Sequence, residues 1–130
     1  MHILRALTIF ISLLLGAAPI ASAQDYNKGL EAAQAGDFAT AIKEWKPLAE
    51  QGNASAQNGL GLMYSLGASF LRKGVLQDNL TAHMWYNISS ANGGISGRDW
   101  VAGLMTATDI SKATAMAREC MKSNYKKCVW

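Results

Sequence analysis

The chain has little of what most catalytic and metal sites need. It contains 2 His, one of them His2 beside the N-terminus, and 2 Cys, Cys120 and Cys128. Four zinc ligands cannot be assembled from this set, and no glycine-rich phosphate loop precedes a helix pattern. No alternating strand or hairpin pattern is present either. We therefore expect an all-α protein that is not an enzyme and holds no metal or cofactor.

A hydrophobic run long enough to span a membrane is also missing. The longest candidate, Leu7 to Leu15, falls well short of the roughly 20 apolar residues that a span needs, and Pro19 follows it. Arg5 precedes this run, and Ala21-Ser22-Ala23 follows as a small-residue cleavage site. This pattern is typical of a secretory signal peptide. We expect residues 1–23 to be removed, leaving residues 24–130 periplasmic or secreted, without stable membrane insertion.

An excess of one charge is absent as well. The chain has 12 basic and 9 acidic side chains; without Arg5, 11 basic side chains remain, so the net charge falls from +3 to +2. The basic pairs Arg72-Lys73 and Lys126-Lys127 are not clustered into a stripe. Nucleic-acid binding, which needs such a stripe, is therefore not expected.

The two cysteines stand eight positions apart near the C-terminus. In an exported chain such a pair favours a disulfide between Cys120 and Cys128. On one continuous helix their Cα atoms would be about 12 Å apart, whereas a disulfide needs about 7 Å or less. The pairing therefore requires the last helix to end near Ser123-Asn124, so that the tail folds back.

Six amphipathic segments make up the rest of the chain. Asp37 and Asp78 are good N-cap residues, and Thr106 with Asp109 resembles a capping box. Gly52 is placed where a glycine ends a helix, whereas Pro47 is expected to kink the helix that contains it. The predicted helices cover about 25–35, 38–51, 54–66, 79–92, 98–105 and 107–124.

A weak internal repeat with an offset of 41 residues joins these segments. Ordinary helical periodicity is the alternative explanation, but the offset stays constant across two helices. The matched pairs are Ala41 and Ala82, Trp45 and Tyr86, Gly52 and Gly93, and Leu60 and Val101.

At these positions the chain resembles the Sel-one-like repeat family, a relative of the tetratricopeptide repeats. The resemblance covers about residues 37–105. It implies antiparallel helix pairs in a short right-handed α-solenoid of about six helices, with units at about 37–73 and 78–105 and a C-terminal capping helix at about 107–124. The residues that carry it are Ala41, Trp45, Leu48-Ala49, Gly52, Ala56-Gln57, Leu60-Gly61, Met63-Tyr64, Gly74-Val75-Leu76-Gln77-Asp78, Ala82, Trp85-Tyr86 and Gly93.

Two features depart from the family pattern. Residues 68–73 form an insertion that carries Phe70 and Leu71, and Ser89-Ser90 stand where the family prefers two alanines. The small residues are expected to set the distance between helices, and the aromatic residues to fill the remaining gaps. The predicted packing positions are Ala41, Trp45, Ala49, Gly52, Ala56, Leu60, Gly61, Ala82, Trp85, Tyr86 and Gly93.

Helical repeats stack into curved arrays whose concave face binds peptides or proteins. The resemblance therefore implies an exported adaptor with a protein or peptide partner. Gln57, Tyr64 and Arg98 are the candidate contact residues on that face. For Tyr64, a place in the core is the favoured alternative, because aromatic residues at helical spacing usually pack inward.

Two other functions remain open at this stage. Ser123-Asn-Tyr-Lys126 matches the Ser-x-x-Lys motif of penicillin-interacting enzymes, which makes a cell-wall or β-lactam-interacting protein the alternative. A self-associating structural protein is the other, since short arrays are marginally stable and the insertion is apolar. His83 has no expected catalytic partner and is interpreted as a surface side chain.

Overall fold

The computed structural model describes residues 21–67 and 77–130, with side chains from Tyr26 onward. Within these ranges the protein is all-α, which confirms the predicted fold class. Most of the predicted signal peptide, the insertion with Phe70 and Leu71, and the family-like turn at 74–76 lie outside the described residues. The helices are α1 (Ala21–Gln34), α2 (Phe38–Glu50), α3 (Ala54–Leu66), α4 (Asn79–Ala91), α5 (Arg98–Ala102) and α6 (Ala107–Lys122).

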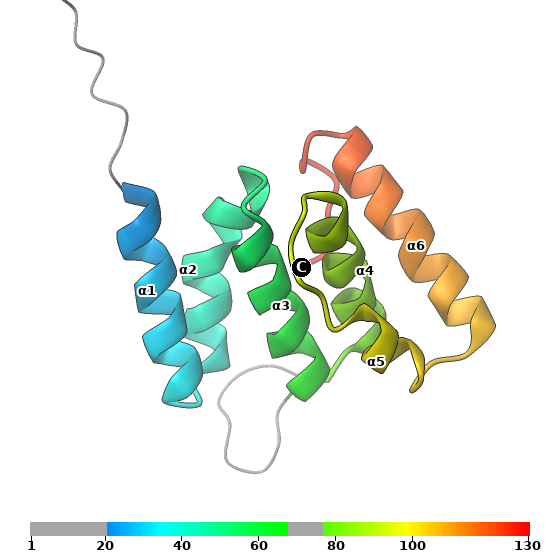
Figure 1. The fold of residues 1–130 in the computed structure, drawn as a ribbon, viewed down its shortest axis with the longest axis horizontal. Helices are drawn as coiled ribbons and strands as arrows, with labels where there is room; N and C mark the ends of the chain where they lie inside the picture. Colours follow the sequence, from blue (N-terminus) through cyan, green and yellow to red (C-terminus); the bar gives the residue numbers. More distant parts are fainter. Residues whose placement is uncertain (1–20, 68–76) are drawn as a thin grey trace, which may run out of the picture.

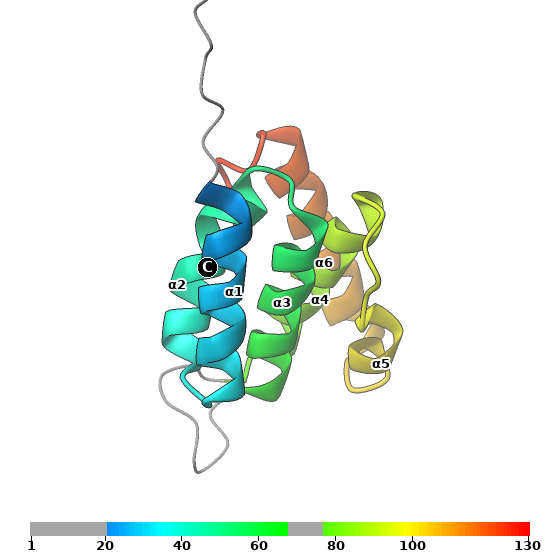
Figure 2. The ribbon, with the colours of Figure 1, turned by 60° about the vertical axis from the view of Figure 1, so that its left-hand side comes forward.

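The helices pack on their neighbours in chain order, as Figures 1 and 2 show. α1 lies against α2, α2 against α3, and α3 against α4, which in turn contacts both α5 and α6. The array is therefore a row of helix pairs in which α4 has neighbours on both sides.

The 41-residue repeat is visible in the helix caps. Asp37 accepts a hydrogen bond from the Thr40 backbone N–H at 3.1 Å, and Asp78 accepts one from the Thr81 N–H at 3.0 Å. In both cases the second carboxylate oxygen accepts from the threonine hydroxyl. The two caps are the same local structure, placed one repeat apart.

The ends of these helices repeat as well. Gly52 and Gly93 adopt φ of +85° and +82°, a conformation that glycine adopts without steric cost. The backbone N–H of Asn53 donates to the Leu48 carbonyl, and the N–H of Gly94 donates to the Ser89 carbonyl, again 41 positions apart. The helix-to-helix turns are therefore equivalent, although the residues that form them differ.

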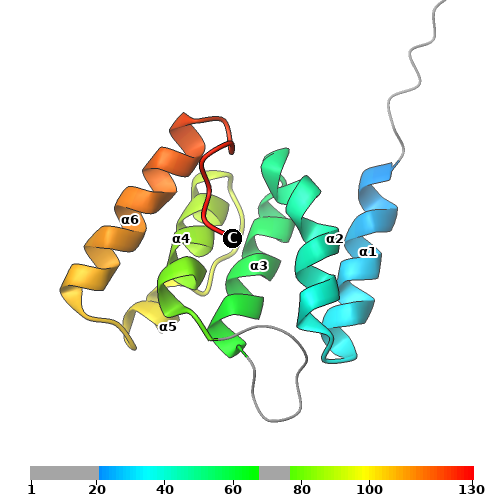
Figure 3. The ribbon, with the colours of Figure 1, turned by 180° about the vertical axis from the view of Figure 1, so that it is seen from behind.

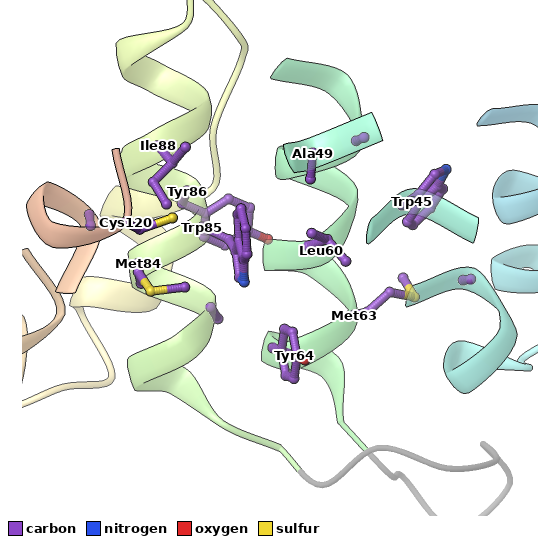
Figure 4. Close-up of a cluster of buried hydrophobic side chains, with 14 of the residues drawn as sticks. Trp45, Ala49, Leu60, Met63, Tyr64, Met84, Trp85, Tyr86, Ile88 and Cys120 are labelled. Atoms are coloured by element: carbon purple, nitrogen blue, oxygen red, sulfur yellow. The ribbon is translucent and has the colours of Figure 1, made fainter. Parts of the chain in front are cut away.

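The core lies between the helix layers and uses small residues for close approach. Gly59 faces the Trp45 ring, where a Cβ atom would stand 2.7 Å from Trp45 Cε3. Figure 4 shows Trp85 and Tyr86 pointing from α4 toward Leu60 of α3. Alanines with no exposed surface complete the interfaces, at Ala41, Ala49, Ala56 and Ala82.

Two helix boundaries differ from the prediction. α5 ends at Ala102 rather than near Met105, because Gly103 caps it and Thr106 takes an extended conformation to cap α6. α1 begins at Ala21, four residues before the predicted start. Pro47 lies inside α2, which continues to Glu50.

Candidate interaction surface

Gln57 is buried at the centre of α3 and cannot touch a partner. Its side chain has 0% exposure. The amide nitrogen donates to the Ala49 carbonyl at 3.0 Å, and the amide oxygen accepts from Asn92 at 2.8 Å. The prediction that Gln57 lies on a binding face is therefore wrong: this side chain joins α2, α3 and the end of α4 from inside.

Tyr64 and Arg98 do not form a common surface with it. Tyr64 is 9% exposed and belongs to the hydrophobic core. Burial raises the pKa of its phenol, and the nearby Asp78 carboxylate raises it further. Arg98 opens α5, and its side chain is 44% exposed and paired with Asp99 at 3.1 Å. Tyr64 therefore fits the core alternative, and Arg98 is the surface residue of the three.

His83 is buried rather than exposed, which corrects its interpretation as a surface residue. Only 3% of its surface is accessible, and its Nδ1 lies 3.0 Å from the Asn87 amide nitrogen. Burial lowers the pKa of this imidazole, and the nearby Arg98 charge lowers it further, whereas Asp99 acts in the opposite direction. A neutral ring can accept the Asn87 N–H at Nδ1, so His83 is a polar member of the α4 packing.

The hydroxyl of Ser123 has a structural role at the end of α6. It donates to the Cys120 carbonyl at 2.8 Å and accepts from the Lys127 backbone N–H at 2.9 Å. A nucleophilic serine must transfer its hydroxyl proton to a base, whereas the hydroxyl of Ser123 donates this proton in a hydrogen bond to a carbonyl oxygen. This geometry gives no support to the Ser-x-x-Lys interpretation.

The cysteines form the predicted disulfide. α6 ends at Lys122, and Asn124 and Tyr125 adopt φ of 53° and 64°. This turn brings the Cα atoms of Cys120 and Cys128 to 4.5 Å and joins them covalently. The chain after the helix therefore reverses direction and returns toward α4, as Figure 3 shows.

The returning tail is fastened to the array at its first residues. The Asn92 amide donates to the Tyr125 hydroxyl at 2.9 Å and also to Gln57 at 2.8 Å. Asn92 is the C-cap residue of α4. One chain of hydrogen bonds thus connects the tail, the end of α4 and the interior of α3.

The last residue lies on the first helices of the two repeats. The Trp130 ring packs on Trp85 of α4, with 4.7 Å between ring centroids and a tilt of 42°. The ammonium group of Lys46, on α2, lies 4.4 Å from the Trp130 centroid. We call the surface formed by Lys46 and Trp85, which Trp130 covers, the tail surface. The 41-residue offset does not predict this surface; its one sequence signal is a tryptophan two positions after a bridging cysteine.

Trp85 carries an unmet hydrogen-bond donor. Its side chain has 0% exposure, and its Nε1 is buried without a hydrogen-bond partner in residues 21–67 and 77–130. A buried unpaired donor costs about 1–3 kcal/mol. The burial of Trp85 therefore carries an energetic cost at this nitrogen atom.

A second feature is an open apolar groove at the α1 end of the array. It has a volume of about 370 Å³. Three leucines on its walls are partly exposed, Leu30 at 39%, Leu62 at 40% and Leu66 at 37%. Sequence reasoning missed it, because the groove forms only where α1, α2 and α3 meet. The other lining residues are Ala33, Gln34, Ala35, Gly36, Phe38, Trp45 and Met63.

Within residues 21–67 and 77–130, no helix is long and apolar enough to cross a membrane. The same residues hold no group of three or more His, Cys, Asp or Glu side chains that could bind a metal ion.

The fold places the protein among all-α helical-repeat proteins. Comparisons with known protein families, with curated proteins and with solved structures found no match.

Proposed function

We propose that this protein is an exported helical-repeat module that binds a protein or peptide partner and does not itself catalyse a reaction. The observation that carries this proposal is the apolar groove between α1, α2 and α3. Leu30, Leu62 and Leu66 border it and each is more than a third exposed. Exposed apolar residues that gather around a concavity are typical of interaction sites rather than of inert surface.

The groove also has a suitable floor. Phe38 and Met63 are 2% exposed and are held by the packed core, so the floor is preformed. Apolar walls over a rigid apolar floor fit the side chains of an amphipathic helix or an extended apolar segment. Export is supported by the N-terminal pattern and is compatible with the Cys120–Cys128 disulfide.

The test is in-situ crosslinking followed by capture from the native cell envelope. The full chain, with its own leader, is compared with a Leu62→Lys, Leu66→Lys variant, which places two charges at the groove. The matched control is Ile95→Lys, Leu104→Lys, which changes residues 92% and 56% exposed outside the groove. Circular dichroism and thermal unfolding of each variant check that the fold is intact.

We expect the parent and the control to recover the same partner, and the groove variant to recover at least about tenfold less, equivalent to about 1.4 kcal/mol of binding. Equal recovery by all three proteins would contradict the proposal. Recovery of a second copy of the chain alone would instead identify self-association as the role of the groove.

A further inference from the structure

We propose that the tail surface is a second peptide-binding surface, which the chain's own Trp130 occupies while the Cys120–Cys128 disulfide is intact. The partner that it fits is an extended peptide segment with a tryptophan or similar aromatic side chain. Reduction of the disulfide by an external dithiol releases Trp130 and opens the surface.

The occupant is already seated in the structure and shows which chemistry the surface accepts. Trp130 stacks on Trp85, and Lys46 stands over the same ring. An aromatic ring and a cation that both contact the same ring form a site for an indole. The first helices of both repeats, α2 and α4, contribute one of these groups each, so the site exists only when the two repeats are packed together.

The tail is held in a way that permits release. In the described part of the chain, no hydrogen bond is formed by residues 128–130; the last one toward the C-terminus is donated by Lys127 to Ser123. Val129 is 44% exposed, and Trp130 is only partly buried. The hydrogen bonds of Tyr125 hold the start of the tail. Beyond Lys127, the disulfide is the main constraint, apart from the ring contacts, that keeps Trp130 on the tail surface.

The covalent constraint also explains how a weak contact can exclude other peptides. A short tether keeps the local concentration of Trp130 at about the millimolar level. A free peptide must compete with this concentration, so its apparent affinity is reduced by the small fraction of molecules with an open surface.

The redox step is an ordinary thiol–disulfide exchange. A thiolate of the external dithiol attacks Sγ of Cys128, since Cys120 has no exposed surface. The Cys120–Cys128 bond breaks, a mixed disulfide forms at Cys128, and Cys120 leaves as a thiolate and takes up a proton. The second thiol of the reductant then displaces the Cys128 thiolate, which is also protonated. The protein disulfide gains two electrons and two protons, and the dithiol becomes a disulfide.

The first measurement follows the Trp85 indole N–H by nuclear magnetic resonance. The oxidised chain is compared with the same chain reduced by dithiothreitol and with a Trp130→Ala variant that keeps the disulfide. The proposal predicts that reduction moves the Trp85 signal to its position in Trp130→Ala, while the Trp100 signal stays in place. A Trp85 signal that stays at its oxidised position in the reduced, folded chain would overturn the switch.

The second measurement tests the open surface directly. The probe is a synthetic peptide Ser-Asn-Tyr-Lys-Lys-Ser-Val-Trp, which copies the tail with serine in place of cysteine. It is titrated to about 1 mM, the range set by the tether. The probe should shift the Trp85 signal in Trp130→Ala at a concentration at least tenfold lower than in the oxidised parent. A probe that ends in alanine should have no effect. No shift in the folded variant, or equal shifts in both proteins, would overturn the proposed surface.

This surface and the apolar groove can fail independently. Adding Leu62→Lys and Leu66→Lys to the Trp130→Ala variant should leave probe binding unchanged, because the ring contacts of Trp130 are with Trp85 and Lys46 and not with these leucines. Partner capture that depends on the groove, together with a failed probe titration, would leave the proposed function intact and refute only the tail switch.

Discussion

Adding one methyl group at Gly61 should destabilise the protein, although the same change usually strengthens a helix. A Cβ atom on Gly61 would lie 2.6 Å from Cδ1 and 2.7 Å from Cε1 of Tyr86. These distances are shorter than any relaxed carbon–carbon contact. Either the Tyr86 ring or the α3–α4 interface must therefore move.

Close neighbours restrict any movement of the Tyr86 ring. Gly97 approaches other atoms of the same ring, and a Cβ added there would stand 2.8 Å from the Tyr86 Cζ atom. Tyr86 is 3% exposed, and its hydroxyl lies 3.5 Å from Ser65 Oγ. Because two glycines and a polar contact hold the ring, the overpacking falls in the upper part of the usual range of about 1–3 kcal/mol. The gain in helix propensity from glycine to alanine is about 1 kcal/mol.

The difference leaves Gly61→Ala about 1–2 kcal/mol less stable than the parent. For a domain of this size that lowers Tm by roughly 4–8 °C per kcal/mol. The matched control is Gly103→Ala, because Gly103 has φ −63° and a Cβ there meets nothing closer than 3.4 Å. Urea and thermal unfolding measure both. A Gly61→Ala protein as stable as Gly103→Ala would refute the argument that glycine is required for the α3–α4 contact.

Two other predictions concern pH and the disulfide. Burial lowers the pKa of His83 in the native chain below its usual 6.5. Between the native pKa and 6.5, the unfolded chain therefore binds more protons than the native chain. The free energy of unfolding should consequently fall as pH is lowered through 6.5. Urea unfolding at a series of pH values should show this slope, and a His83→Gln variant should lack it; an equal slope in both would assign it to another group. Replacing Cys120 and Cys128 with serine should lower the free energy of unfolding by about 2–3 kcal/mol, the chain-entropy value for so short a loop. Equal stability of the double variant and the oxidised parent would contradict this.

The local features of the fold could be predicted because their causes are local. Asp37 and Asp78 cap helices through side chains that reach only three residues along the chain. Gly52 and Gly93 end helices because few other residues adopt their positive φ. The same reasoning located the end of α6, since a Cys120–Cys128 bridge is incompatible with a continuous helix.

The candidate sites could not be predicted, because they depend on which surfaces meet. Gln57 and Arg98 are both polar residues of helical segments. Helical periodicity does not show that the Gln57 amide is buried against the Ala49 carbonyl while the Arg98 guanidinium is exposed. His83 has the same difficulty, since its burial depends on α4 having neighbours on both sides. The apolar groove likewise requires three helices, and no single helix stripe encodes it.

The position of the tail also bears on how so short an array can be stable. Two repeats leave apolar surface at each end of a helical stack, and such arrays generally need at least three units. At one end, α6 covers α4 with Ala113, Ala117 and Cys120, none more than 1% exposed. The disulfide and tail then extend this cover across α4 to Lys46 of α2. At the other end α1 covers α2 but leaves Leu30 partly exposed. At the C-terminal end the chain itself therefore covers α4, whereas at the other end the apolar groove beside α1 stays open.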